Sequence, residues 1–140
     1  MIIRGNILNV FTDEIYPGEI KIEQGIIQSI KEVDQYFTDI IVPGFIDAHT
    51  HIESSMLTPS RYAEIALKHG TTGVVCDPHE IANILGMEGI EYMINDAKFA
   101  PLKFFFTAPP CVPSMPFETN GASIDSFDVE SLIKRDDFVA

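Results

Sequence analysis

Basic residues are scarce in this sequence. Its 140 residues include only 9 Lys and Arg against 21 Asp and Glu, so that 9 − 21 gives a formal net charge of −12 at pH 7. A chain with this charge is repelled by the phosphates of nucleic acids and by anionic membrane surfaces. We therefore expect no nucleic acid and no membrane among its partners.

Long apolar runs and cysteines are also few. No apolar run approaches the ~20 residues that span a bilayer, and Asn6, Asn9 and Asp13 interrupt any apolar stretch of the signal-peptide kind. The two cysteines, Cys76 and Cys111, lack the spacing of a disulfide framework, so we expect both to be free and buried. These features predict a reduced, cytoplasmic protein.

The composition that remains is that of an ordinary globular chain, with 46% hydrophobic and 21% charged residues. Residues 1–40 favour β-strands, because residues 19–23 alternate with period two and a Gln24-Gly25 turn leads into a second apolar run at 26–30. A few strands cannot form a stable sheet without a partner layer. We expect this β module to depend on other parts of the protein.

From residue 40 onward, strand and helix patterns alternate. Thr58-Pro59 has the residues of a helix start, and Gly70 those of a helix end. Repeated strand–helix units indicate an α/β fold with a parallel sheet and right-handed crossovers. The expected buried strands are residues 40–49, 72–76 and 102–108, the helical segments contain residues 61–69, 90–97 and 131–134, and a fourth strand begins at residue 137.

The histidines are concentrated in one part of the chain, between residues 49 and 79. His49 and His51 lie at the end of the first of these strands, where alternate side chains face the same side, so that both imidazoles can reach one divalent ion. The alternative is that one ring packs and the other is solvated. His79 follows the second strand, whereas His69 precedes Gly70 at a helix C-terminus, where a cationic ring is favourable.

Several segments resemble a known enzyme family. Residues 43–51, Pro-Gly-Phe-Ile-Asp-Ala-His-Thr-His, resemble the first metal-binding strand of the amidohydrolase superfamily. Taken in order, further segments resemble more specifically the bacterial and archaeal adenine deaminases. These segments are residues 49–59, 69–72, 77–83, 111–113 and 116–119.

The resemblance implies a (β/α)8 metal-dependent hydrolase barrel beside a small β-sandwich domain. Residues 1–40 would supply strands of the β-sandwich, and residues 41–140 the first strand–helix units of the barrel. A barrel of this kind takes ~250 residues. We therefore expect the sequence to be the amino-terminal portion of a longer enzyme, incomplete as given and inactive by itself.

The resemblance also implies a reaction, the hydrolytic deamination of adenine to hypoxanthine and ammonia in purine salvage. Adenine would be the small-molecule partner, and a homo-oligomer is left open. The cofactor would be a divalent metal, with manganese or iron favoured over zinc and two ions in the full-length enzyme. A divalent ion lowers the pKa of bound water from 15.7 towards ~7, which supplies a nucleophile at neutral pH.

Residue roles follow from the same resemblance. His49 and His51 would bind the first metal, and Asp47 would orient the strand end or a ligand, as carboxylates around metal sites do. Glu53, at the next position on the same face, is a candidate for binding substrate, a second metal or a proton. Its alternative is a solvated loop carboxylate.

The second strand ends in three further candidates. Asp77, His79 and Glu80 would lie at the mouth of that strand, where they could contact metal or purine. The alternative for His79 is a structural role at the start of a helix. Phe104 to Phe106 are expected to be core residues of the third strand rather than a stacking surface for a base.

Three other interpretations need to be weighed. The pattern of His51, Glu53 and Cys111 partly matches the zinc signature of cytidine-type deaminases, H-x-E…P-C-x-x-C. Ser114 stands where that signature requires its second cysteine, so this match fails. The chain could instead be an amidohydrolase that acts on a cyclic amide, which residues 77–83 disfavour, or an inactive truncated fragment.

Overall fold

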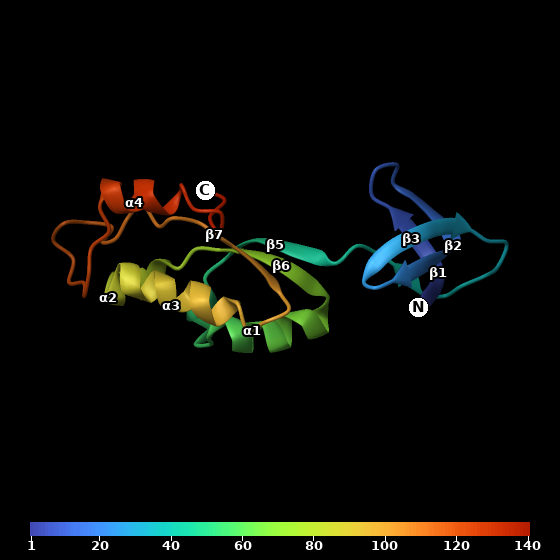
Figure 1. Ribbon diagram of the computed structural model, residues 1–140, viewed down its shortest axis with the longest axis horizontal. Coiled ribbons are helices and arrows are strands. Elements are labelled where there is room, and N and C mark those ends of the chain that lie inside the picture. Colours follow the sequence, from blue (N-terminus) through green and yellow to red (C-terminus); the bar gives the residue numbers. More distant parts are fainter. The chain divides into compact units, whose positions relative to one another are not determined.

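A computed structural model describes residues 1–140. The chain divides into two compact units, Met1–Pro43 and Gly44–Ala140, and each contains its own β-sheet (Figure 1). None of its helices combines the length and the apolar character needed to cross a membrane.

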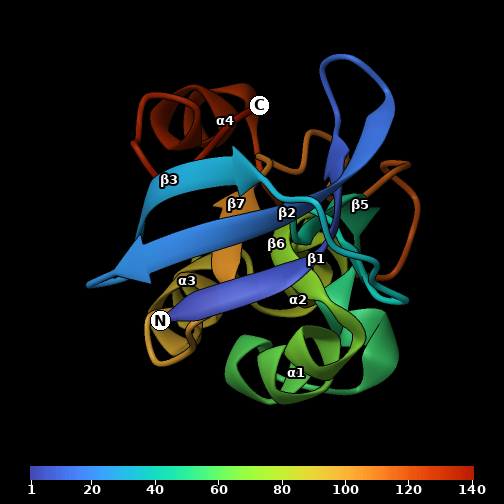
Figure 2. The ribbon, with the colours of Figure 1, turned by 90° about the vertical axis from the view of Figure 1, so that its right-hand side faces the viewer.

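The first unit is a four-stranded sheet in the order β3-β2-β1-β4. Figure 2 shows β3, β2 and β1 as neighbours. β1 and β2 pair antiparallel, as do β2 and β3, whereas β4 pairs parallel with β1. The predicted turn between β2 and β3 is confirmed: Gln24 and Gly25 have φ angles of 51° and 77°, the left-handed values that a two-residue hairpin turn requires. The strands are β1 (Ile2–Asn9), β2 (Glu14–Glu23), β3 (Ile26–Glu32) and β4 (Ile40–Ile41).

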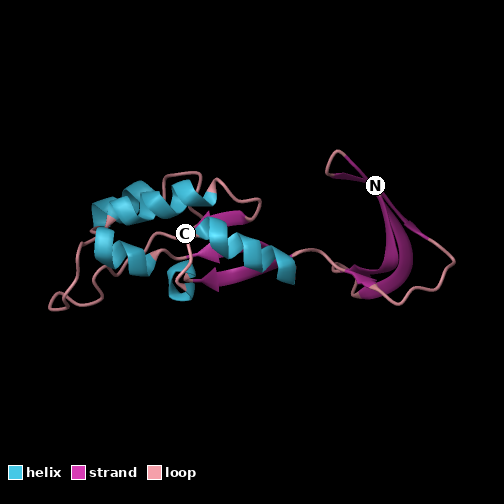
Figure 3. Cartoon of the chain, turned by 90° about the horizontal axis from the view of Figure 1, so that it is seen from below, coloured by secondary structure: helices cyan, strands magenta, loops and turns pink.

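The second unit contains a three-stranded parallel sheet in the order β5-β6-β7, with helices along it (Figure 3). Its parallel strands and connecting helices confirm the predicted α/β character. In chain order the elements are β5 (Phe45–Thr50), the 3-10 helix η1 (Ile52–Ser55), α1 (Pro59–Ala66), the 3-10 helix η2 (Leu67–His69), β6 (Thr71–Cys76), α2 (His79–Leu85), α3 (Met87–Ala97), β7 (Lys103–Phe106) and α4 (Ser126–Leu132).

Helices α1 and α3 follow the sequence signals closely. The predicted apolar face of α3 is buried in the core of the unit, and its members are Ile90, Met93, Ile94 and Ala97. The helix start at Thr58-Pro59 and the left-handed Gly70 are also confirmed. The side chain of Thr58 makes no cap, because Asp96 of α3 instead accepts the Ser60 amide hydrogen at 2.7 Å.

The strand predicted over residues 40–49 is wrong in two respects. It is interrupted at Pro43-Gly44, so that Ile40 and Ile41 form β4 of the first sheet, and β5 of the second sheet begins at Phe45. β5 is not buried, since Phe45 and Ile46 are 59% and 65% exposed. The physical reason is that β5 is an edge strand of its sheet, with β6 on only one side.

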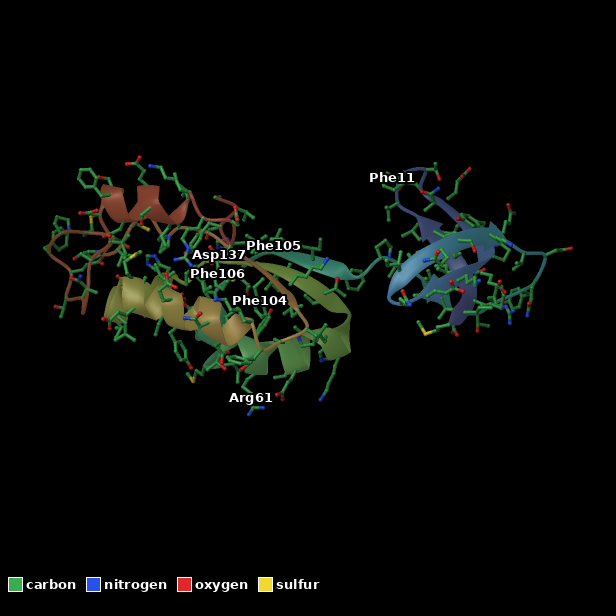
Figure 4. All side chains as sticks on the ribbon, viewed as in Figure 1. Phe11, Arg61, Phe104, Phe105, Phe106 and Asp137 are labelled. Atoms are coloured by element: carbon green, nitrogen blue, oxygen red, sulfur yellow. The ribbon has the colours of Figure 1, made fainter.

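The end of the chain also departs from expectation. The last helix runs over Ser126–Leu132 rather than residues 131–134, because the Asp125 carboxylate accepts the amide hydrogens of Phe127 and Asp128 and so starts the helix early. The fourth strand is reduced to one parallel bridge between Phe106 and Phe138. Figure 4 labels Asp137 beside β7, where its carbonyl accepts the Phe106 amide hydrogen at 3.1 Å.

Two further expectations about burial are wrong in part. Both cysteines are free, as predicted, but Cys111 is exposed because it lies in the loop after β7, whereas Cys76 is buried within β6. Burial raises the pKa of the Cys76 thiol to about 12. In β7, Phe106 is a core residue but Phe105 is 36% exposed, because successive side chains of a strand face opposite sides.

Candidate metal centre

The carboxyl end of β5 brings two histidine rings together. His49 Nε2 lies 3.2 Å from His51 Nε2, and the ring centroids are 4.9 Å apart in an edge-to-face arrangement. His49 and His51 are two positions apart at the carboxyl end of β5, so the alternation of side chains along a strand directs both rings to the same side. The two ring nitrogens therefore converge on one point, which is the geometry that the spacing predicts.

The second nitrogen of His51 faces oxygen acceptors. His51 Nδ1 lies 3.1 Å from the Asp77 carbonyl oxygen and 3.1 Å from Glu80 Oε2. A carbonyl and a carboxylate can only accept, so these partners assign the proton to Nδ1. His51 Nε2 then carries a lone pair that faces His49 Nε2 at 3.2 Å and can accept its hydrogen. This is the tautomer that a metal-binding histidine uses when its other nitrogen donates to an oxygen.

Asp47 supports the backbone at the histidine pair. Its Oδ1 accepts the amide hydrogen of His49 at 3.1 Å. The carboxylate therefore folds back on its own strand and fixes the chain two residues further on. This contact agrees with an orienting role for Asp47.

Two hydrogen bonds join η1, which follows β5, to α2, which follows β6. Glu53 Oε1 accepts the Ile81 amide hydrogen at 3.3 Å, and Ser54 Oγ donates to Glu80 Oε1 at 2.6 Å. The first of these bonds satisfies one of the free amide groups at the start of α2, where Pro78 offers no side-chain cap. The sequence does not predict this role of Ser54, because nothing in a serine four residues after a strand end signals a partner 26 residues away.

The other two histidines lie outside the pair. The His79 ring centroid is 6.4 Å from that of His51, and His79 Nδ1 lies 3.8 Å from the Sγ atom of Cys111. His79 is the first residue of α2, so it borders the pair without joining it. His69 is exposed at the end of η2, before β6 begins, as its sequence position predicts.

The carboxylates near this pair are poorly satisfied. Three buried oxygens have no hydrogen-bond partner: Glu53 Oε2, Asp77 Oδ1 and Glu80 Oε2. The last of these lies at ion-pair distance from His51 Nδ1 but outside hydrogen-bond geometry. Unpaired buried polar atoms are rare in folded proteins, and a group of them calls for an explanation such as an ion or ligand. We call His49, His51, Glu53, Asp77 and Glu80 the histidine cluster.

The environment sets the charges in this cluster. Burial raises the pKa of the Glu53 and Asp77 carboxyls above their ordinary values. Burial would do the same to Glu80, but hydrogen bonds from Ser54 and from its own backbone, with the nearby His51, bring the pKa of that carboxyl below its ordinary value. The cluster thus mixes one well-stabilised carboxylate with two poorly solvated ones.

This donor set fits a divalent metal in part. Imidazole nitrogens and carboxylate oxygens are common ligands of zinc, manganese and iron. However, no group of three or more histidine, cysteine, aspartate or glutamate side chains is arranged to hold an ion within residues 1–140. The chain thus offers a converging nitrogen pair with supporting oxygens, which is part of a ligand set rather than all of it.

Comparison with known proteins points in the same direction. Three curated relatives are named adenine deaminase. The relative from Methanosphaera stadtmanae is 71% identical over all 140 residues of this chain. That from Methanothermobacter thermautotrophicus is 54% identical over 99% of the chain, and that from a Sulfurovum species is 48% identical over 96%. The resemblance to this family that the sequence motifs predict is confirmed.

The alignments cover all or nearly all of this chain but little of each relative. They include 26%, 26% and 25% of the lengths of these three proteins, so that the chain spans about a quarter of the curated relatives that it matches. The sequence profile of the amidohydrolase family matches residues 40–139, which contain the whole histidine cluster. The chain therefore belongs to the amidohydrolase family.

Proposed function

We propose that this chain is part of an adenine deaminase, which hydrolyses the 6-amino group of adenine to give hypoxanthine and ammonia in purine salvage. The observation that carries the proposal is the likeness of the entire chain, at 71% identity, to a protein of that name. The histidine cluster at the carboxyl ends of two parallel strands supports it, because this edge of a parallel sheet is where α/β enzymes place their chemistry.

We propose that His49 and His51 hold a divalent ion through their Nε2 atoms. Such an ion lowers the pKa of bound water from 15.7 towards ~7 and so provides the nucleophile for hydrolysis. We expect manganese or iron rather than zinc, and two ions in the complete enzyme. Because residues 1–140 bring only two nitrogens together, the remaining ligands would come from residues outside this chain.

The other side chains of the cluster would serve the same reaction. The Asp77 carbonyl keeps the proton of His51 on Nδ1, and Asp47 fixes the backbone of His49. Glu53 Oε2 and Asp77 Oδ1 have no protein partner, so we propose that they accept N–H groups of the purine or a proton in transfer. His79 borders the pair at the start of α2 and is proposed to contact the purine.

The two units would have different places in the complete enzyme. We propose that the four-stranded sheet of the first unit belongs to a small β-sandwich, and that the three parallel strands of the second unit open a (β/α)8 barrel. The proposed setting is the cytoplasm, and assembly into a homo-oligomer is compatible with the proposal.

The direct test uses the longer polypeptide that contains these 140 residues. It is purified, stripped with a chelator and reloaded with Mn²⁺, and the change in ultraviolet absorbance from adenine to hypoxanthine is followed. We expect turnover that disappears with the chelator and returns with Mn²⁺. Hydrolysis of a dihydroorotate- or hydantoin-like ring without any action on adenine would overturn the proposal and favour a cyclic amidase.

A further inference from the structure

Glu80 is hydrogen-bonded through one of its oxygens and makes an ion-pair contact through the other. Ser54 Oγ donates to Oε1 at 2.6 Å, which is short for a hydrogen bond between a hydroxyl and a carboxylate and therefore strong. The second oxygen, Oε2, lies 3.1 Å from His51 Nδ1. Glu80 thus connects a serine of η1 with a ring nitrogen of the histidine pair.

In this arrangement the Ser54 hydroxyl determines the orientation of the Glu80 carboxylate. The Glu80 side chain is 42% exposed and has three rotatable bonds, so that packing alone does not fix its rotamer. The hydrogen bond from Ser54 is the contact that selects the rotamer in which Oε2 faces His51. Without it the carboxylate is free to turn to solvent, and the ion-pair contact of Oε2 with His51 Nδ1 is lost.

The orientation of the His51 ring then has consequences at its other nitrogen. An acceptor at Nδ1 fixes the ring angle and the tautomer, and thereby aims the lone pair of Nε2. In this structure Nε2 is aimed towards His49 Nε2. Loss of the Glu80 carboxylate beside Nδ1 would leave the ring held by the Asp77 carbonyl alone, and would loosen it and weaken whatever Nε2 binds.

We propose that Ser54 is a positioning residue for the metal centre, which acts through Glu80 to orient the His51 ring. This inference rests on the proposed function in one respect, namely that the histidine pair binds a divalent ion. It also gives Glu80 a role different from the direct contact with metal or purine that the sequence suggested, because both of its oxygens already face protein groups.

The neighbouring serine provides a matched control. Ser55 Oγ donates to the Ile52 carbonyl oxygen at 2.6 Å, within the same 3-10 helix, and this bond involves no residue of the histidine cluster. Ser54→Ala and Ser55→Ala therefore each remove one strong hydroxyl donor from η1. They differ in whether the lost bond leads to His51.

The experiment measures Mn²⁺ affinity in the longer polypeptide, by electron paramagnetic resonance of the free ion. Ser54→Ala is expected to weaken Mn²⁺ binding by about 10-fold, the lower end of the losses seen when groups that orient a metal ligand are removed. Ser54→Thr, which keeps the hydroxyl, should restore the affinity, and Ser55→Ala should leave it unchanged. At saturating Mn²⁺ the KM for adenine should be the same in all four proteins.

A double-mutant cycle tests whether Ser54 acts through Glu80. Glu80→Gln should also weaken Mn²⁺ binding, and adding Ser54→Ala to it should weaken binding no further, because the two residues form one path to His51. Additive losses would overturn the inference. Thermal melts of the same proteins identify any variant that fails to fold, and in that case the Ser54→Thr and Ser55→Ala comparison decides.

The outcomes separate this inference from the proposed function. Equal Mn²⁺ affinities for Ser54→Ala and Ser55→Ala would overturn the positioning role, even in an enzyme that deaminates adenine. Loss of affinity in Ser54→Ala alone would support that role, even if the wild type left adenine untouched and the proposed function fell. A wild type that binds no divalent ion would overturn both.

Discussion

The second unit contains two polar clusters that differ in how well the oxygens of their carboxylates are hydrogen-bonded. In the histidine cluster three buried carboxylate oxygens lack partners. In the second group, the Arg135 cluster, Arg135 donates to both oxygens of Asp137, at 3.0 and 2.8 Å, and to Glu91 of α3. The guanidinium also stacks 5.5 Å from the centre of the Phe138 ring.

The pKa values of the carboxyls differ between the two clusters in the same way. Hydrogen bonds from Arg135 hold the pKa of the Asp137 carboxyl below its ordinary value, whereas burial raises the pKa of Glu53 and Asp77. A lowered carboxyl pKa stabilises the folded chain at neutral pH, and a raised one costs stability there. The difference indicates that the Asp137 carboxyl adds to the stability of the folded chain at neutral pH, while the Glu53 and Asp77 carboxyls reduce it there.

The strongest test removes one ring from the histidine cluster. His51→Asn keeps a donor near the position of Nδ1 but loses Nε2, so that the metal-dependent reaction should fall by on the order of 10³-fold, the equivalent of several kcal/mol of metal catalysis. The melting temperature should change little. The measurement is the rate of adenine deamination by the longer polypeptide in the presence of Mn²⁺.

His69→Asn is the matched control for this change, since His69 is exposed and lies outside the cluster. It should keep full activity. Full activity in His51→Asn as well would remove the reason for treating the histidine cluster as a metal site.

The opposite pattern is expected at the Arg135 cluster. Arg135→Met keeps the apolar stem of the side chain but removes its charged hydrogen bonds, and should lower the free energy of unfolding by about 2 kcal/mol. Urea denaturation measures the change. Lys134→Met is the control, because Lys134 and Glu130 form an exposed pair that contributes at most about 0.5 kcal/mol. Equal losses in the two variants would contradict the contrast, as would a loss of Mn²⁺ affinity in Arg135→Met.

How far the sequence predicts these regions depends on the range of the interactions. Strand alternation was enough to bring His49 and His51 together, and helical spacing was enough for the buried face of α3. The hydrogen bond between Ser54 and Glu80 could not be predicted, since it depends on how two separate strand–helix units are placed. The exposure of β5 likewise depends on its position at the sheet edge rather than on its own apolar residues.

One miss was local. Asp125 and Asp128 form a reciprocal cap at the start of α4, with each carboxylate accepting a backbone amide hydrogen from the other residue. The usual signal has glutamate or glutamine at the third helical position. Here the shorter Asp128 fills that position, so the sequence lacks the usual signal of a helix start.

A smaller stability effect is expected at the cap of α1. The Asp96 carboxylate accepts hydrogens from the Ser60 amide at 2.7 Å and from the Ser60 hydroxyl at 3.1 Å. Asp96→Ala should cost about 1 kcal/mol of unfolding free energy, as the loss of an N-terminal helix cap does. The exposed neighbour Asn95 provides the control variant Asn95→Ala. No difference between the two in urea denaturation would show that the cap contributes nothing.

The smallest expected effect is the acid response of the Arg135 cluster. Because the pKa of Asp137 is lowered in the folded chain, its contribution is present above the ordinary aspartate pKa and is lost as the pH falls through the folded value. The difference in stability between wild type and Arg135→Met should therefore shrink by about a few tenths of a kcal/mol below about pH 4. Denaturation at pH 7 and pH 3.5 tests this, and a growing difference would reverse the assigned sign.

The parallel pairing of β4 with β1 has a consequence for the order of events during synthesis. β1, β2 and β3 are joined by short turns and can pair within about microseconds of leaving the ribosome. The Asn6 amide, however, donates to the Asp39 carbonyl at 2.8 Å, and Ile7 pairs with Ile41. At roughly 5–20 residues per second the ribosome delivers these partners seconds later. For that interval the edge of β1 that β4 later covers is unpaired, so a chaperone that binds unpaired strands is offered this edge in addition to the outer edge of β3.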